Sequence, residues 1–363
     1  KEKKWKKLFG FKSRKAENKI EQKHCNLALA IQKVTEEIVL KMATEAKRLT
    51  NADNLSMAGG VALNCVANGV LQRKKIFKNI YIQPAAGDAG GALGAAQAAY
   101  HIYFNRERKC LDSIDKMKGS YLGPFFSNKE ITQMNKSTKA IYKQFHDFDE
   151  LTQLIAHKIA VGKVVGWFQD RMEFGPRALG NRSIIADARS TSMQKNLNLK
   201  IKFRESFRPF APSILREDLN EWFDFDSDSP YMLFVSEVKK NKQIEMKESE
   251  KNLFGIDKLN IKRSKIPAVT HVDYSARIQT VTKKTNARYY DLISKFKEKT
   301  GCPVIVNTSF NVRGEPIVNT PTDAFNCFMG TELDYLIIGD CILDKSKQNS
   351  NLKKDYTKEF ELD

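Results

Sequence analysis

The order of apolar segments along the chain predicts an α/β fold. Residues 25–49 repeat apolar side chains at intervals of three and four, which is the spacing of one helix face. Short apolar runs at 55–58 and 80–83 have the length of strands and alternate with helical segments. Glycine-rich loops at 59–60 and 87–91 lie where a strand gives way to a helix. A chain of 363 residues is long enough for two domains.

A basic segment precedes the first long helix. Residues 1–24 contain ten Lys or Arg and three Glu without an apolar period, so we expect an exposed lead-in. The helix from Cys25 should end near residues 49–51. Its apolar positions mark one face that we expect to be buried: Leu27, Ala30, Ile31, Val34, Ile38, Met42, Ala46 and Leu49. Further helices are expected at 61–71 and 92–100, and the small residues of the second suit close backbone packing.

A second region begins after a loop near residues 110–119. Its apolar patterns predict helices at 151–160, 289–299 and 322–329 and strands at 164–168, 303–306 and 335–338. Residues 169–189 form a polar stretch. Residues 236–265 are charged and poorly patterned, so we expect an exposed insertion. A charged tail, residues 346–363, follows the last strand.

Composition and charge narrow the function classes. The chain carries 61 Lys and Arg against 43 Asp and Glu, a formal charge of +18. Because 45 of these cations are Lys spread over several segments, we read the charge as a solvated surface and do not expect a nucleic-acid partner. No apolar run approaches the roughly 20 residues of a membrane helix, and Leu8–Phe11 is too short for the apolar region of a signal peptide. We expect no membrane partner and a cytoplasmic location.

The spacing of the cysteines and histidines matches no metal-binding motif. The six cysteines form no C-x-x-C pair, and the five histidines form no i, i+4 pair. We therefore expect reduced thiols and no zinc site built from these residues.

Both glycine loops could bind a nucleotide. Gly59 and Gly60 leave backbone N–H groups free for an anion or ribose, although two glycines also make a simple tight turn. Asp88, after Gly87, stands at a helix start, where a carboxylate repels phosphate unless a cation lies between them. Asp88 is therefore either a metal ligand or a helix N-cap.

The local enrichment of arginine is the strongest indication of a site for phosphate or carboxylate. Seven Arg and three Lys lie between Trp167 and Arg216, which reverses the bias of the whole chain. A guanidinium grips phosphate or carboxylate at two points, which an ammonium does not do. Residues 174–183 place Arg177 and Arg182 on a loop shaped by Gly and Pro, and Arg208 stands beside two prolines. The alternative is an internal salt-bridge network with Asp170, Glu173, Asp187 and Glu205.

A predicted strand leads into a polar loop at residues 304–316. Asn307 and Ser309 follow the apolar run, and polar groups at the carboxyl end of a strand are where open α/β sheets bind ligands. A hydrogen-bonded turn is the alternative.

Six motifs together resemble the O-carbamoyltransferases of antibiotic and nodulation-factor biosynthesis. They are Gly59–Asn64, Gly87–Gly94, Glu173–Ala186, Lys202–Pro212, His271–Val281 and Asn307–Val318. The resemblance implies that residues 25–110 are the second lobe of an actin- and sugar-kinase-like ATP-binding domain. An α+β carbamoyltransferase domain would follow at 120–345. The family's first lobe, with a His-x-x-x-His metal pair, has no counterpart in this chain, so either a longer polypeptide or a separate chain would supply it.

The resemblance also implies a reaction. Carbamoyl phosphate and ATP would give carbamoyl-adenylate, whose carbamoyl group would pass to the hydroxyl of a small-molecule acceptor. Carried over by position, Gly59, Gly60, Asn64 and Gly87 would bind ATP, and Asp88 would hold a divalent metal, Mg or Fe, with other ligands from the absent lobe. Carbamoyl phosphate would be held by Arg177, Arg182, Lys202, Arg208, Asn307 and Ser309, with Lys202 and Arg208 as catalytic groups.

Two other functions are compatible with the residues. One is a kinase-like nucleotide-binding protein without carbamoyl chemistry, against which the arginine cluster argues. The other is a non-enzymatic, basic binding module.

Overall fold

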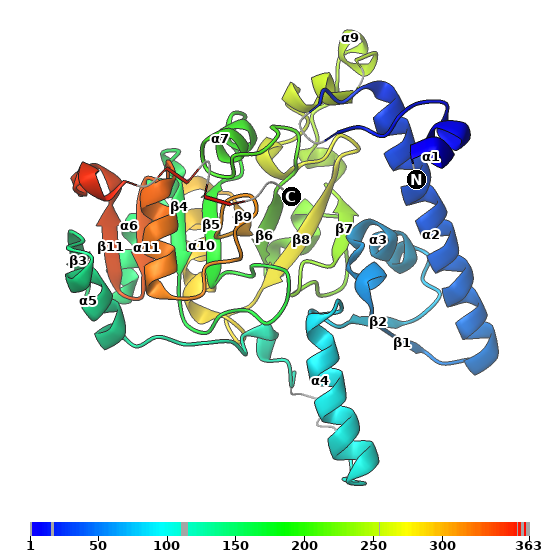
Figure 1. Ribbon diagram of the computed structural model, residues 1–363, viewed down its shortest axis with the longest axis horizontal. Helices are drawn as coiled ribbons and strands as arrows, with labels where there is room; N and C mark the ends of the chain where they lie inside the picture. Colours follow the sequence, from blue (N-terminus) through cyan, green and yellow to red (C-terminus); the bar gives the residue numbers. More distant parts are fainter. Residues whose placement is uncertain are drawn as a thin grey trace.

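The computed structural model describes residues 2–15, 18–109, 115–253, 255–353, 355–356 and 359–360. A small N-terminal unit is built on a two-stranded sheet, and a larger unit is built on a nine-stranded sheet (Figure 1). Among the described helices, none combines the length and the apolar character needed to cross a bilayer.

The N-terminal unit has the alternation that the sequence predicts. Its elements are α1 (Glu2–Phe9), α2 (Gln22–Thr50), β1 (Asn54–Met57), α3 (Cys65–Arg73), β2 (Asn79–Ile82) and α4 (Ala89–Ala98). β1 and β2 pair in parallel with α3 between them. The helix expected at 61–71 is divided, because a 3₁₀ turn at Gly60–Leu63 precedes α3 and the Asn64 side chain accepts a hydrogen bond from the Ala67 amide to cap it. Residues 2–15 are mostly exposed as expected, although α1 is helical.

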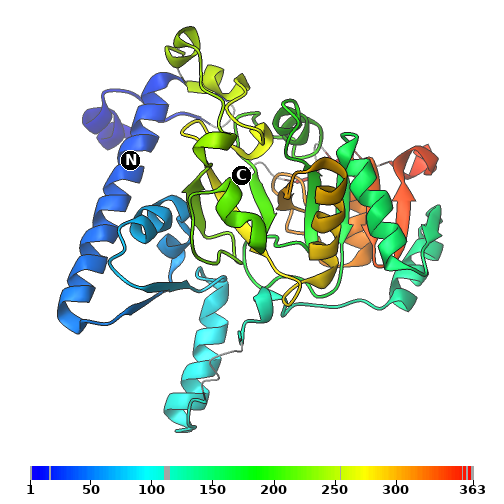
Figure 2. The same ribbon diagram turned by 180° about the vertical axis from the view of Figure 1, so that it is seen from behind.

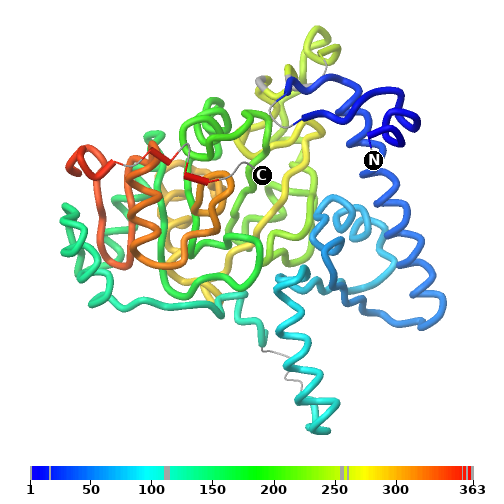
Figure 3. Tube along the Cα trace, in the orientation of Figure 1, coloured from blue at the N-terminus to red at the C-terminus, as the bar shows by residue number. Residues whose placement is uncertain are grey.

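The prediction that the apolar face of α2 is buried was wrong. Met42 is 68% exposed and Ile38 is 51% exposed, and the buried residues of this helix are Glu36 and Ala43. Figure 3 shows α2 running along the outside of the molecule. The helix packs on α3, while much of its apolar face lines an open groove of about 530 Å³ that it forms with β1 and residues 61–62. Helical periodicity reports an apolar face but not whether another element covers it.

The prediction that the small-residue helix packs closely was also largely wrong. α4 has no buried residue and projects from the molecule in both ribbon views (Figure 2). The exception is Gly90, where a Cβ would lie 2.2 Å from the Ala85 carbonyl oxygen. The helix continues as a π-helical turn, Ala99–Tyr103, whose aromatic side chains are exposed.

The large sheet is mixed, with strand order β3-β11-β10-β4-β5-β9-β6-β8-β7. Its strands are β3 (Tyr142–Gln144), β4 (Val165–Phe168), β5 (Arg182–Asp187), β6 (Ala211–Leu215), β7 (Phe234–Glu237), β8 (Ser275–Val281), β9 (Val304–Ser309), β10 (Tyr335–Ile338) and β11 (Cys341–Asp344). The longer helices around it are α5 (Asn128–Ser137), α6 (Phe148–Ala160), α7 (Met193–Lys200), α10 (Ala287–Thr300) and α11 (Pro321–Gly330), with short helices α8 (Leu219–Trp222) and α9 (Glu248–Lys251). α11 lies in front of the sheet in Figure 1, and α6 and α10 pack together on the opposite face (Figure 2). This α/β architecture confirms the predicted fold class.

Local sequence signals set the ends of two long helices of this unit. Asn286 caps α10 by accepting a hydrogen bond from the Tyr289 amide, and Gly301 ends it with a φ of +69°. Thr320 and Asp323 form a capping box at the start of α11, with Pro321 in the first turn.

Two segments in this unit differ from the sequence expectations. The polar stretch 169–189 contains β5, a fully buried strand. The insertion 236–265 is not wholly exposed, because Arg263 and Ser264 are buried and the Arg263 guanidinium donates to the carbonyls of Thr270 and His271. In both segments the buried polar groups find hydrogen-bond partners that periodicity does not reveal.

Candidate functional site

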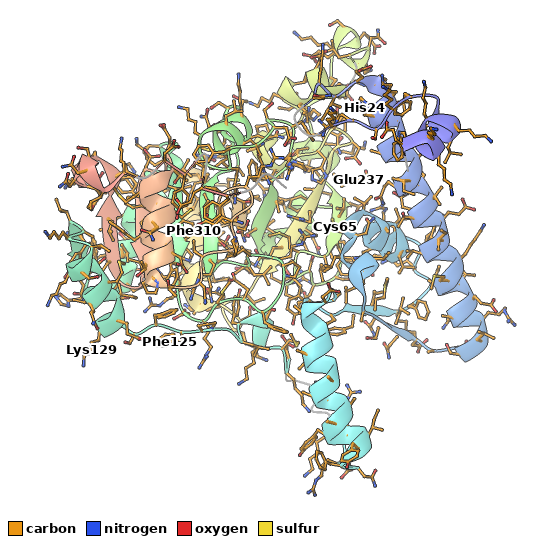
Figure 4. All side chains as sticks on the ribbon, in the orientation of Figure 1. His24, Cys65, Phe125, Lys129, Glu237 and Phe310 are labelled. Carbon is orange, nitrogen blue, oxygen red and sulfur yellow. The ribbon has the colours of Figure 1, made fainter. Side chains whose placement is uncertain are left out.

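A cavity of about 380 Å³ lies where the two units meet. It is lined by Cys65 and Val66 of the N-terminal unit, by Pro176, Arg177, Ala178, Arg204, Arg208, Pro209, Phe210, Ala211, Met232, His271 and Arg277, and by Asn307, Thr308 and Ser309 at the end of β9. Figure 4 labels Cys65 at the start of α3, which packs on the edge strand β7. A neighbouring polar groove of about 390 Å³ shares Arg204, Arg208 and Ser309 and is also lined by Lys202.

Arg177 lines the cavity with donors that no protein group uses. Its Nη2 donates weakly to the Leu63 carbonyl oxygen at 3.5 Å, its buried Nε has no hydrogen-bond partner, and it forms no ion pair within the described residues. Burial, followed by the charge of Arg277, lowers its pKa to about 10. A buried guanidinium with free donors is a site for an anion.

Three further arginines, Arg204, Arg208 and Arg277, line the same cavity. Arg208 keeps one ion pair, with 3.2 Å between its Nε and Glu205 Oε2. Arg277, on β8, was not among the predicted site residues. The signal that could have identified it is a charged side chain between Ala276 and Ile278, inside a short strand. The alternative of internal salt bridges is therefore confirmed at Arg208 and at Arg189, whose Nη2 lies 2.7 Å from Asp187 Oδ2, but not at Arg177.

Lys202 lies in the neighbouring groove, buried against the loop after β9. Its ammonium donates to Ser309 Oγ at 3.2 Å, to the Asn311 carbonyl at 2.8 Å, to Asn311 Oδ1 at 2.8 Å and to the Ser309 carbonyl. Burial, with a smaller contribution from Arg204, lowers its pKa to about 7. Lys202 thus fixes the loop that carries Ser309 and holds a positive charge that titrates near neutral pH.

Asn307 is held in one orientation. Its Nδ2 donates to Gln279 Oε1 at 2.8 Å, to Ser213 Oγ at 3.1 Å and to the Ala178 carbonyl at 3.2 Å. Its buried Oδ1 has no partner. This residue lines the cavity with its amide nitrogen already committed to the protein.

Arg182 does not lie in the cavity, and we correct the expectation that it binds substrate. It is fully buried, and its guanidinium donates to the carbonyls of Gln169, Asp170, Asn181 and Pro124. The chain turns into β5 at this residue, so its side chain points among backbone carbonyls while Arg177, five residues earlier, reaches the cavity. Arg182 therefore stabilises the surrounding backbone and does not face the cavity.

The two glycine loops lie together. The Gly59 amide donates to the Ala86 carbonyl at 2.8 Å, and Gly59 has a φ of +94°, which favours glycine. Gly60 has nothing within 4 Å of a hypothetical Cβ, and Gly87 has only a Leu63 methyl at 3.6 Å. The Asn64 side chain has fewer groups available for a ligand, since it caps α3 and its Nδ2 donates to Gln32 Oε1 at 2.9 Å.

Asp88 is exposed at the start of α4 and makes no capping hydrogen bond. The N-cap alternative is therefore not supported. Within the described residues no group of three His, Cys, Asp or Glu side chains could hold a metal ion. One carboxylate is too few ligands for a divalent cation, so these residues alone do not fit a metal centre.

Comparisons with known proteins give the family. A model of the carbamoyltransferase C-terminus matches residues 156–345, and a model of the carbamoyltransferase N-terminus matches residues 1–97. An uncharacterized protein of Synechocystis is 53% identical over 99% of this chain and 59% of its own length. The nodulation protein NolNO of Sinorhizobium fredii is 39% identical over 89% of this chain and 44% of its own length.

The 3'-hydroxymethylcephem-O-carbamoyltransferase of Streptomyces clavuligerus is 31% identical over 88% of this chain and 54% of its own length. The chain thus spans about half the length of the curated relatives it matches. The arginines that line the cavity all lie inside the C-terminal match, and these similarities identify the chain as a member of the carbamoyltransferase family of enzymes.

Proposed function

We propose that this chain binds carbamoyl phosphate in the cavity between Arg177, Arg208 and Arg277 and, with ATP, forms carbamoyl-adenylate. The observation that carries the proposal is the convergence of three guanidiniums from separate segments, with Arg177 retaining unused donors. Bidentate donors in a low-dielectric space suit a phosphate dianion. Ser309 adds a hydroxyl to the same wall.

The charges suit the proposed chemistry. Formation of carbamoyl-adenylate consumes one water and releases phosphate and pyrophosphate, so negative charge develops on departing oxygens. Fixed cations stabilise such charge without reorganisation. Arg208 is shared by the cavity and the neighbouring groove and would contact the phosphate, whereas Lys202 would act from the groove. Cavity walls from both units would keep water from the mixed anhydride.

Nucleotide binding is assigned to the N-terminal unit. Gly59, Gly60 and Gly87 leave space for a ligand against the main chain, and the hydrogen bond between residues 59 and 86 holds their loops together. Asn64 would support this site as the cap of α3. Asp88 would contribute one carboxylate to a divalent metal, Mg or Fe, whose other ligands come from outside this chain.

Transfer to a hydroxyl acceptor is proposed for the chain together with a segment that carries the family's His-x-x-x-His pair, supplied in the same polypeptide or by a separate chain. The exposed apolar faces of α2 and of the π-helical turn after α4 support this, since a folded neighbour would cover them. Ile38, Met42 and Tyr103 are examples.

Calorimetry with carbamoyl phosphate tests the first part. We expect binding by the parent chain and loss of at least tenfold in affinity for Arg177→Met. Radiolabelled carbamoyl transfer to a panel of hydroxyl acceptors, with pyrophosphate release measured in parallel, tests the second part with and without the supplied segment. ATP binding without carbamoyl phosphate binding would favour a kinase-like protein. Salt-dependent nucleic-acid binding with no nucleotide binding would favour a basic module.

A further inference from the structure

The arginine-lined cavity lacks an obvious partner for one part of the proposed substrate. Guanidiniums donate hydrogen bonds to phosphate, but the amino group of a carbamoyl group is itself a donor and needs an acceptor. Acetyl phosphate has the same phosphate and nearly the same shape, with a methyl group in place of the amino group. Selection between the two requires a hydrogen-bond acceptor on the cavity wall.

His271 lines this cavity and is held by a short relay. Its Nδ1 lies 2.9 Å from Ser275 Oγ, and that hydroxyl donates to Asp273 Oδ1 at 2.6 Å. The Ser275 amide also donates to Asp273 Oδ1, at 3.1 Å. The His271 amide donates to the Ser275 carbonyl at 2.8 Å and the Tyr274 amide donates to the His271 carbonyl at 3.1 Å, so the turn that carries the ring is fixed relative to the start of β8.

The relay determines the tautomer of the imidazole. A serine hydroxyl has one proton, and here the carboxylate of Asp273 receives it. The hydroxyl oxygen then accepts from Nδ1–H of His271, which leaves Nε2 without a proton in the neutral ring. No described residue forms a hydrogen bond with Nε2. The ring therefore offers a lone pair on the side not used by the relay.

The surroundings keep this ring neutral. Burial lowers the pKa of His271 to about 4, with Arg277 and Arg263 acting in the same direction and Asp273 acting against them. A neutral imidazole is unusual in a wall of cations, because its Nε2 accepts where its neighbours donate. Asn307, across the same cavity, offers a second buried oxygen without a partner.

We propose that His271 is a specificity-determining residue whose Nε2 accepts a hydrogen bond from the amino group of the carbamoyl moiety, with Ser275 and Asp273 as positioning residues. This inference rests on the proposed binding of carbamoyl phosphate in the cavity. The arginines bind the phosphate, and the imidazole distinguishes a carbamoyl group from other acyl groups by this hydrogen bond.

The test compares the affinities of the whole chain for carbamoyl phosphate, acetyl phosphate and inorganic phosphate. We expect the parent chain to prefer carbamoyl over acetyl phosphate by roughly tenfold, the effect of one buried hydrogen bond made or left unmade. His271→Asn retains a group near the Nδ1 position but has nothing at Nε2, and the preference should fall to within about twofold. His271→Gln can place an oxygen near the Nε2 position and should retain most of the preference. Ser275→Ala removes the relay and should reduce the preference in part.

The outcomes separate this inference from the proposed function. Absence of carbamoyl phosphate binding by the parent chain overturns both. Equal binding of carbamoyl and acetyl phosphate by the parent overturns the inference alone, as does an unchanged preference in His271→Asn. Equal affinities of parent and variants for inorganic phosphate, together with similar melting temperatures, show that the cavity is intact. A parallel loss of all three ligands in His271→Asn would show a purely structural role and would also overturn the inference.

Discussion

The guanidinium carbon of Arg182 lies 3.6 Å from the centre of the Phe168 ring. The two residues are register partners on the neighbouring strands β4 and β5, so the contact forms within the sheet itself. The guanidinium then donates to carbonyls that converge from residues 124, 169 and 170. A charge in this position stabilises the fold and is closed to a ligand.

Arg182→Met should therefore affect stability rather than binding. The substitution leaves several buried carbonyls without a donor, each at a cost of about 1–3 kcal/mol, so we expect the free energy of unfolding to fall by several kcal/mol. Denaturant titration of parent and variant measures this change. A variant with parental stability but weakened carbamoyl phosphate binding would return Arg182 to the ligand site.

Arg208→Lys should weaken ligand binding and leave stability nearly unchanged. Arg208 is partly exposed at the cavity and pairs with a single carboxylate, Glu205. A lysine keeps the charge but loses the two-point contact with phosphate. We expect roughly tenfold weaker carbamoyl phosphate binding in calorimetry, since a charge-assisted hydrogen bond contributes about 1.5–3 kcal/mol. The melting temperature should change little, and unchanged affinity would remove Arg208 from the site.

Lys202 should make stability depend on pH. Its folded-state pKa is about 7, well below the ordinary value of 10.5, so between these values the unfolded chain binds more protons than the folded one. The free energy of unfolding contributed by this group therefore rises with pH above 7, and the full cost of burying the charge is present below 7. From pH 7 to 9, Lys202→Met should reduce this rise by about 1–2 kcal/mol.

Denaturant titrations of Lys202→Met and the parent at several pH values provide the measurement. The slope rather than the absolute stability is the informative quantity, since the variant also leaves the Ser309 and Asn311 carbonyls without their donor. Parallel pH profiles for the two proteins would contradict a neutral-range pKa for Lys202.

Gly69 should be essential for the contact between the two units. A Cβ at this position of α3 would lie 2.2 Å from the Val235 carbonyl oxygen of β7, and the opposing atoms are backbone. We expect Gly69→Ala to lower the free energy of unfolding by about 1–3 kcal/mol or more, because neither backbone can shift cheaply.

The matched control for Gly69→Ala is Gly94→Ala in α4. No atom lies within 4 Å of its hypothetical Cβ, and alanine favours the helix by about 0.5–1 kcal/mol, so this variant should be neutral or slightly stabilising. Similar losses for both variants in thermal melts would show that helix geometry rather than the α3–β7 contact is responsible.

The sequence by itself determined the order of the local elements and the segment in which the cavity arginines lie. The alternation of strands and helices from 54 to 98 followed from periods of two and 3.6, and the glycine loops marked the strand-to-helix turns. The reversal of Lys and Arg usage located the segment that carries Arg177 and Arg208, because residue chemistry does not depend on the fold.

Only the tertiary structure decided which of these groups face the cavity. Arg177 and Arg182 lie only five residues apart, yet the first reaches the cavity and the second, at the start of β5, is enclosed by carbonyls from residues 124 and 169–170. Arg277 and His271 join Arg177 only because β8 pairs with β6 next to β9. Periodicity along α2 likewise defined an apolar face without determining its burial. Sequence patterns report the preferences of neighbouring residues, whereas burial and convergence depend on segments that are distant in the chain.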